Sequence, residues 1–325
     1  MIAKPRQIPL NIQVLLALLR RLPKNHIKRT QILEELGRRQ AGFQGEESLD
    51  FHLSHLPEKE FIILHDLNLP DGKYNCQIDT FLLTSKFALI IEVKNLKGKL
   101  TFDLINDQLI QKYDGIEKGY AYPVSQAQRK ISIIKKLLSD WHLPQVPIDF
   151  MIVISNQYAI LEFIGNIPEI RKRVCKADIF LKRVGLFENI YTKEILSPKE
   201  LRKFTKLLIK ANTPPTSHIM EKYSIKKYDL LTGPHCPTCS YLPLTREKRK
   251  WFCPICNTYL NDAHIYLLQD YFLLFDIKIT NREFRRVAHI ESPDTSGRML
   301  RSVNLCCTGK NKDRVYFPAK FPWEN

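Results

Sequence analysis

The segment CQIDTFLLTSKFALIIEVKN, residues 76–95, constrains the fold of this chain more than any other. Two apolar runs of strand length flank a short polar turn, which is typical of a β-hairpin. Each run also carries charge, with Asp79 in the first and Glu92 and Lys94 in the second. Buried charges are costly unless a partner or a bound ion compensates for them. The segment therefore predicts a central hairpin with a charged cluster at one end.

A turn with Ser85-Lys86 at its tip predicts a register in which Asp79 faces Glu92 and Gln77 faces Lys94. Opposed carboxylates repel unless a cation lies between them, and oxygen ligands suit Mg²⁺ or Mn²⁺. Lys94 would then steer or deprotonate a water, or neutralise charge that develops on a phosphate. An internal salt-bridge cluster, or another register that exposes the charges, would explain the same residues without a metal.

The elements around this hairpin predict an α/β fold. A helix at 45–56 precedes a strand at 61–67, the hairpin follows, and an amphipathic helix at 123–141 leads to the apolar strand IDFMIVIS at 148–155. A fully apolar strand is typical of a sheet that is covered on both faces. The order helix, three strands, helix, strand therefore predicts an α/β sandwich with a mixed sheet.

Three stretches in this order resemble the nuclease-related domain (NERD) proteins of Gram-positive bacteria. They are GEESLDFHL (45–53), QIDTFLLTSKFALIIEVKNLKGKL (77–100) and AYPVSQAQRKI (121–131). That family is assigned to the PD-(D/E)xK nuclease superfamily, whose restriction-endonuclease-like core has the order αβββαβ. The resemblance covers about residues 40–155 and implies metal-dependent cleavage of the phosphodiester bonds of DNA.

The resemblance also implies roles for individual residues. Asp79 matches the first strand acid of the family, and Glu92 and Lys94 match its ExK pair. Glu46 matches the helix glutamate, and Gln126 the glutamine that opens the next helix. Tyr122 departs from the family, which usually has Asn there. Asp79, Glu92 and the Val93 carbonyl are the expected ligands of Mg²⁺ or Mn²⁺.

Four cysteines form the pairs CPTC (236–239) and CPIC (253–256), separated by 13 residues. This spacing supplies four thiolates for a tetrahedral Zn²⁺ and predicts a structural zinc ribbon with Cys236, Cys239, Cys253 and Cys256 as ligands. An iron site of the rubredoxin kind and a redox dithiol pair are the alternatives. Basic and aromatic residues in the connecting loop suit phosphate contact and base stacking, unless the hairpin is merely charged. They are Arg246, Lys248, Arg249, Lys250 and Trp251.

Residues 280–316 predict two short helices joined by a turn at Ile290-Glu291-Ser292, with Ser292 as N-cap. This pattern resembles a small helix-turn-helix whose second helix would carry Arg298 and Arg301 into a groove of DNA. A protein-binding helical pair is the alternative.

Charge and composition complete the expectations. The net charge of +16 is concentrated in residues 1–40 and 201–325, which suits a polyanion such as nucleic acid or merely favours solubility. We expect a cytoplasmic protein without a membrane-spanning segment, since the apolar runs are far shorter than the ~20 residues that a bilayer requires.

Five segments are expected along the chain. They are a basic helical extension (1–40), the nuclease-like domain (41–210), a linker (211–233), the zinc ribbon (234–260) and a helical module (261–325). The leading hypothesis is a Mg²⁺-dependent DNA nuclease targeted by the zinc ribbon. A catalytically inactive nucleic-acid-binding protein is the second, and a zinc-organised protein–protein adaptor the third.

Overall fold

The structure is a computed structural model that describes residues 1–72, 74–310 and 313–320. The chain divides into two compact units, the first made of residues 1–7 and 40–214 and the second of residues 8–39 and 215–325. Helix α2 (Arg29–Leu53) contributes to both. The units therefore do not follow the linear order expected from the sequence, because residues 8–39 group with the C-terminal part of the chain.

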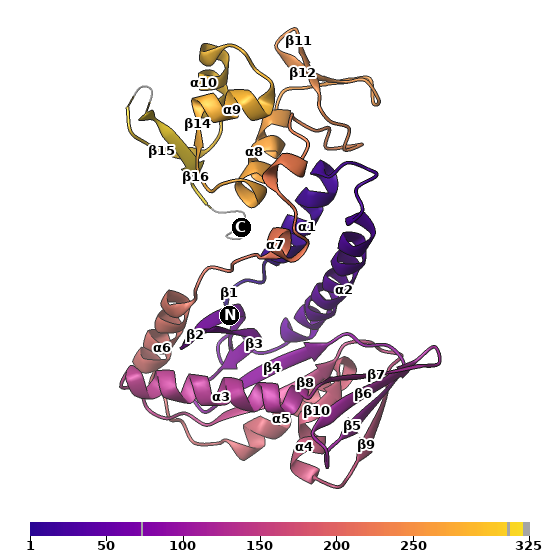
Figure 1. Ribbon diagram of the computed structural model, residues 1–325. Coiled ribbons are helices and arrows are strands. Elements are labelled where there is room, and N and C mark those ends of the chain that lie inside the picture. Colours follow the sequence, from indigo (N-terminus) through magenta and orange to yellow (C-terminus); the bar gives the residue numbers. More distant parts are fainter. Residues whose placement is uncertain (73, 311–312, 321–325) are drawn as a thin grey trace. The chain divides into compact units, whose positions relative to one another are not determined.

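The first unit is built on a six-stranded sheet in the order β1-β2-β3-β4-β8-β10 (Figure 1). Strands β2, β3 and β4 are antiparallel, whereas β8 and β10 continue from β4 in parallel and β1 is parallel to β2. The predicted mixed sheet is thus confirmed. The strands are β1 (Ile2–Lys4), β2 (Ile62–Asp71), β3 (Tyr74–Leu83), β4 (Ala88–Lys94), β8 (Ile148–Ile154) and β10 (Val174–Lys176).

Helices cover both faces of this sheet, as an α/β sandwich requires. Side chains of α3 (Pro123–Asp140) and α6 (Pro198–Ala211) share one core with the sheet, and those of α2 and α5 (Phe180–Ile190) share the other. Figure 1 shows α3 running along the sheet. Sequence signals fix where these helices begin, since α3 starts at a proline and α6 has a Ser197–Glu200 capping box.

A four-stranded sheet in the order β7-β6-β5-β9 extends the first unit. Its strands are β5 (Lys99–Asp103), β6 (Gln108–Tyr113), β7 (Ile116–Ala121) and β9 (Ile160–Ile164), and α4 (Pro168–Arg173) and the 3-10 turn η1 (Ala177–Ile179) follow β9. Leu100, Phe102 and Leu109 from this sheet join the core beneath α3.

In the second unit, α1 (Leu10–Arg21) packs against α8 (Ala263–Leu274). A small sheet of strands β11, β12 and β13 contains the hairpin that connects the two cysteine pairs. A second small sheet has the order β14-β16-β15. The remaining elements are α7 (Ile219–Lys222), η2 (Lys227–Asp229), β11 (Thr245–Glu247), β12 (Lys250–Cys253), β13 (Thr258–Leu260), β14 (Ile279–Thr280), α9 (Asn281–Ala288), α10 (Pro293–Ser302), β15 (Leu305–Thr308) and β16 (Val315–Pro318).

Hydropathy along the helices gives one further result. Among the described residues, every helix is too short or too polar to cross a lipid bilayer.

Candidate active site and metal centre

The β3–β4 hairpin has the predicted register. Four pairs, from Leu83↔Ala88 to Thr80↔Ile91, form the ladder around a turn in which Thr84 accepts hydrogen bonds from the backbone N–H groups of Lys86 and Phe87. The ladder ends there, one pair before Asp79 and Glu92. The carboxylate of Asp79 instead accepts a hydrogen bond from the Val93 N–H at 3.3 Å. Asp79 therefore lies where the two strands separate, next to Glu92.

The ladder ends because the alternation of side chains breaks at this point in both β2 and β3. On β3, Ile78 and Phe81 reach the same core, although strict alternation would place them on opposite faces. On β2 the break falls at Asp66, which has a φ of 52° and occupies the position opposite Asp79 in this register. An irregularity of this kind re-aims side chains near a strand end.

Asp79 is a carboxyl group in an unfavourable environment. Burial, and then the negative charge of Glu92, raise its pKa to about 6. Such a group is stabilised as a carboxylate by a nearby cation.

Glu92 is 5% exposed and is held by two lysines. Lys94 donates to one oxygen at 2.8 Å, and Lys130 of α3 donates to the other. Burial acts to raise the pKa of Glu92, but Lys130 and Lys94 outweigh it and hold the pKa below its ordinary value. Lys94 also donates to Gln126, at 3.4 Å. Gln126 and Lys130 are one helical turn apart, so both point from α3 toward the end of β4.

Glu46 approaches the cluster from α2. A Cβ added to Gly45 would lie 2.5 Å from Asn95 Cβ, so glycine lets the helix come close to the end of β4. Glu46 forms an ion pair with Arg6 at 2.9 Å, and Arg6, only 5% exposed, also pairs with Asp50. Burial, followed by the charge of Asp79, raises the pKa of Glu46 to about 8, against the opposing effect of Arg6.

The structure thus brings together the five residues singled out in the sequence as the candidate centre, Glu46, Asp79, Glu92, Lys94 and Gln126. It adds two buried cations that the sequence analysis missed, Arg6 and Lys130. The spacing of Lys130 four residues after Gln126 could have indicated it. Nothing in the local sequence of Arg6 points to a helix 40 residues away.

The donor types of this centre suit a hard cation, because carboxylates of Asp79 and Glu92 and a main-chain carbonyl are ligands that Mg²⁺ and Mn²⁺ accept. Crowding of the three acids also favours a cation. In this conformation, however, lysines occupy both oxygens of Glu92. The salt-bridge alternative considered for the hairpin charges therefore describes part of the observed arrangement.

Among the described residues, one group of three or more Cys, His, Asp or Glu side chains has its ligand atoms close enough together to hold a metal ion. That group is the four cysteines. Their sulfurs lie within 4.8 Å of one another, with Cys236–Cys256 at 3.9 Å and Cys239–Cys253 at 3.5 Å. Sulfurs about 2.3 Å from a tetrahedral zinc are separated by about 3.8 Å. The cluster is compatible with structural Zn²⁺ in a C-terminal ribbon.

The residues predicted to contact nucleic acid have different environments. Lys248, Arg249 and Lys250 are exposed at the tip of the β11–β12 hairpin. Trp251 is 1% exposed and packs in the core of the second unit. The expectation that Trp251 stacks on bases is therefore wrong, because its ring has no free face.

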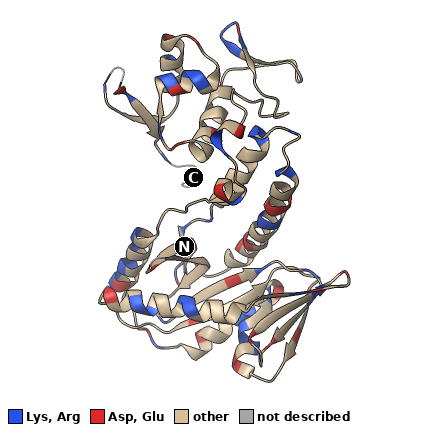
Figure 2. Ribbon diagram, in the orientation of Figure 1, with Lys and Arg blue, Asp and Glu red and all other residues tan. Residues whose placement is uncertain are grey.

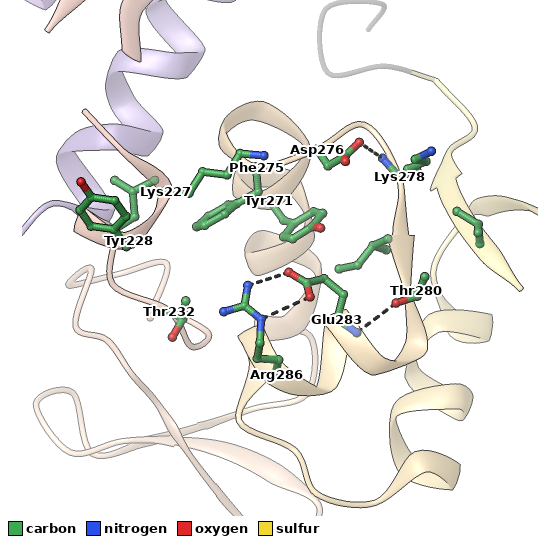
Figure 3. A pocket seen from close by; sticks show the side chains of 13 residues that line it. Lys227, Tyr228, Thr232, Tyr271, Phe275, Asp276, Lys278, Thr280, Glu283 and Arg286 are labelled. Carbon is green, nitrogen blue, oxygen red and sulfur yellow. Dashed lines mark hydrogen bonds and ion pairs between the residues drawn. The ribbon is translucent and has the colours of Figure 1, made fainter. Parts of the chain in front are cut away.

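A pocket of about 860 Å³ lies elsewhere in the second unit (Figure 3). Tyr271 and Phe275 stack in its wall, and Arg286 forms an ion pair with Glu283. The pocket is lined by two carboxylates, Asp276 and Glu283, and among the described residues they belong to no group of three potential metal ligands, so it does not offer the acid cluster that a hydrolytic metal centre requires.

The mixed sheet, the flanking helices and the acid–lysine cluster define a nuclease-like α/β core. In agreement, residues 41–155 match the family model described as the nuclease-related domain (NERD). The chain therefore carries a nuclease-related domain, and the predicted resemblance is confirmed over this segment. A comparison with curated proteins gave no match, and neither did one with solved structures.

Proposed function

We propose that the nuclease-related domain hydrolyses phosphodiester bonds of DNA with Mg²⁺ or Mn²⁺. The observation that carries this proposal is the convergence of Asp79, Glu92 and Lys94 at the end of the β3–β4 hairpin, next to Glu46 and Gln126. Two acids with a lysine beside them supply the charges that phosphodiester hydrolysis requires.

In this proposal Asp79, Glu92 and the Val93 carbonyl would hold the cation, which requires a Glu92 oxygen that a lysine occupies in this structure. When bound, the cation would polarise the phosphate and lower the pKa of a nearby water. Lys94 orients the attacking water or stabilises negative charge on the phosphate, and Gln126 fixes the Lys94 ammonium by accepting its hydrogen bond. Lys130 is a positioning residue that keeps Glu92 ionised, and Arg6 is one that orients Glu46 through their ion pair.

The second candidate is a nucleic-acid-binding protein without catalysis. The pairing of both Glu92 oxygens with Lys94 and Lys130 favours it, because a permanently paired acid cannot hold a metal. In either case the C-terminal ribbon and helical module would deliver the domain to nucleic acid.

One assay separates the two. Supercoiled, linear and single-stranded DNA are incubated with wild type, Asp79→Asn and Lys94→Met in the presence of Mg²⁺ or Mn²⁺. Lys97→Met is the matched control, because Lys97 is exposed and three residues beyond Lys94. We expect a loss of at least about 100-fold in rate for the first two variants and no change for the control. If the wild-type protein leaves the DNA intact, and wild type and both variants bind that DNA equally well, the non-catalytic function would be established instead.

A further inference from the structure

The C-terminal elements of the second unit have the order α8, β14, α9, α10, β15, β16, and their sheet has the order β14-β16-β15. A three-helix core followed by a hairpin that pairs back onto a short strand between the first two helices is the topology of a winged helix. Phe284, Val287 and Leu300 join Leu267 of α8 and Tyr316 of β16 in one core. The elements are therefore one folded module.

Local geometry supports the same assignment. Helix α9 ends at His289 in the left-handed conformation, with φ 57°. Helix α10 begins at Ser292, whose hydroxyl accepts a hydrogen bond from the Thr295 N–H, so the predicted N-cap is confirmed. A tight turn between two helices of this kind is typical of a helix-turn-helix.

The outer face of α10 carries one acid, Asp294 in its first turn, and two cations further along the helix. Its buried residues are Ser296, Gly297, Met299 and Leu300, whereas Arg298 and Arg301 are exposed less than one turn apart. Among the described residues, no carboxylate oxygen lies within 4.0 Å of either guanidinium. Exposed cations without acid partners on one helix face fit a polyanion.

The zinc-ribbon hairpin adjoins this face. Arg246 of β11 lies over the ring of Trp251, 5.2 Å from its centroid, and its Nη1 is 3.8 Å from the sulfur of Met299 in α10. Burial and the nearby charge of Arg298 lower the pKa of Arg246. Two arginines from separate elements therefore lie close together, although like charges repel, and among the described residues neither one forms an ion pair.

Further cations extend this surface along the β11–β12 hairpin. The hairpin tip carries Lys248, Arg249 and Lys250, and Figure 2 shows this tip as Lys and Arg.

We propose that α10 and the β11–β12 hairpin form one surface that binds double-stranded DNA, with α10 in the major groove. The groove is about 12 Å wide and admits an α-helix. The deep, narrow major groove of an RNA duplex does not. Trp251, the aromatic residue expected to stack on unpaired bases, is buried, which also favours a duplex over a single strand. This inference goes beyond phosphodiester hydrolysis and does not depend on it.

The test measures binding by the full-length protein to a fluorescent duplex of about two helical turns, roughly 20 base pairs, and to one of its strands. All proteins carry Asp79→Asn, and divalent cations are omitted, so hydrolysis cannot affect the result. Arg298→Ala/Arg301→Ala removes two charges from α10. Arg202→Ala/Lys206→Ala is the matched control, because these residues are exposed on α6 of the other unit.

We expect the wild-type surface to bind the duplex more tightly than the strand. The α10 variant should lose at least about tenfold in duplex affinity, and the slope of log affinity against log salt should fall by about two. Arg298→Lys/Arg301→Lys keeps both charges and should retain that slope, which distinguishes lost contacts from misfolding. Wild-type affinity and slope in the alanine variant, or equal binding of duplex and strand, would overturn the proposal. Inactivity of the nuclease centre would leave it standing.

Discussion

Replacement of Asp270 by Asn should destabilise the second unit strongly. Asp270 is 0% exposed, and so is Arg21, whose Nε lies 2.9 Å from its carboxylate. Arg20 forms a second ion pair with Asp270 at 2.6 Å. Burial lowers the pKa of Arg21, and the charge of Asp270 opposes this effect. The carboxylate therefore compensates for a buried guanidinium that joins α1 to α8.

The magnitude follows from this geometry. Removal of one partner from a buried ion pair costs about 3–5 kcal/mol, because an uncompensated charge stays in the interior. Arg21 keeps hydrogen bonds to the carbonyl oxygens of Leu231 and Gly233, so we expect the lower end, about 3 kcal/mol. That value corresponds to about 150-fold in an opening equilibrium.

Hydrogen exchange followed by mass spectrometry measures this opening locally. Amides of α1 and α8 should exchange about 100-fold faster in Asp270→Asn, while those of β3 and β4 in the first unit should not change. Asp276→Asn is the matched control, since Asp276 is exposed shortly after the same helix. Unchanged exchange in α1 and α8 would refute the reasoning that this ion pair holds the two helices together.

Three further predictions concern the rest of the molecule. Gly45→Ala should lower the free energy of unfolding by about 1–3 kcal/mol and reduce any nuclease activity, because the new methyl group meets Asn95. Gly42→Ala is the control: its methyl group enters open space, so the variant should be neutral or stabilising in thermal unfolding. Zinc analysis should find one Zn²⁺ per chain. Removal of this ion by a chelator should change the fluorescence of Trp251, because Cys236 and Cys253 share a core with its ring. An unchanged spectrum after metal loss would contradict this prediction. Burial, and then the charge of Arg6, lower the pKa of His65 to about 4 from 6.5. Between pH 4 and pH 6.5, His65 is protonated in the unfolded chain but not in the folded one. The free energy of unfolding should therefore fall by up to about 3 kcal/mol as the pH drops from 6.5 to 4. In His65→Gln, urea unfolding should show a correspondingly smaller dependence on pH, and identical curves would exclude the effect.

Local sequence signals mark several element boundaries of the fold. Proline at the start of α3, the Ser197 capping box of α6 and Ser292 before α10 each mark a helix start, because these residues satisfy or remove free N–H groups there. The turn at Ser85-Lys86 likewise determined the β3–β4 register. Such signals act over a few residues, and a pattern can reveal them without knowledge of the fold.

Other features depend on neighbours that are distant in the sequence. Strict alternation did not reveal the break at Asp66 and Asp79, which requires the two strands to bend together. Trp251 looked like a stacking residue within a basic loop, but the core formed with α8 and α10 covers it. Arg246 and Arg298, assigned to separate modules, lie close together because the ribbon packs against α10.

The hairpin with its acids and lysine, the four-cysteine spacing and the nuclease-related domain can all be recognised in the amino-acid sequence. The cations that hold those acids cannot, since Arg6 from the N-terminal segment and Lys130 from α3 reach Glu46 and Glu92 through the fold. The tertiary structure also decided that α1 joins the C-terminal unit through Asp270. The physical reason is that periodicity and capping are local properties, whereas a buried charge finds its partner wherever packing brings one within reach.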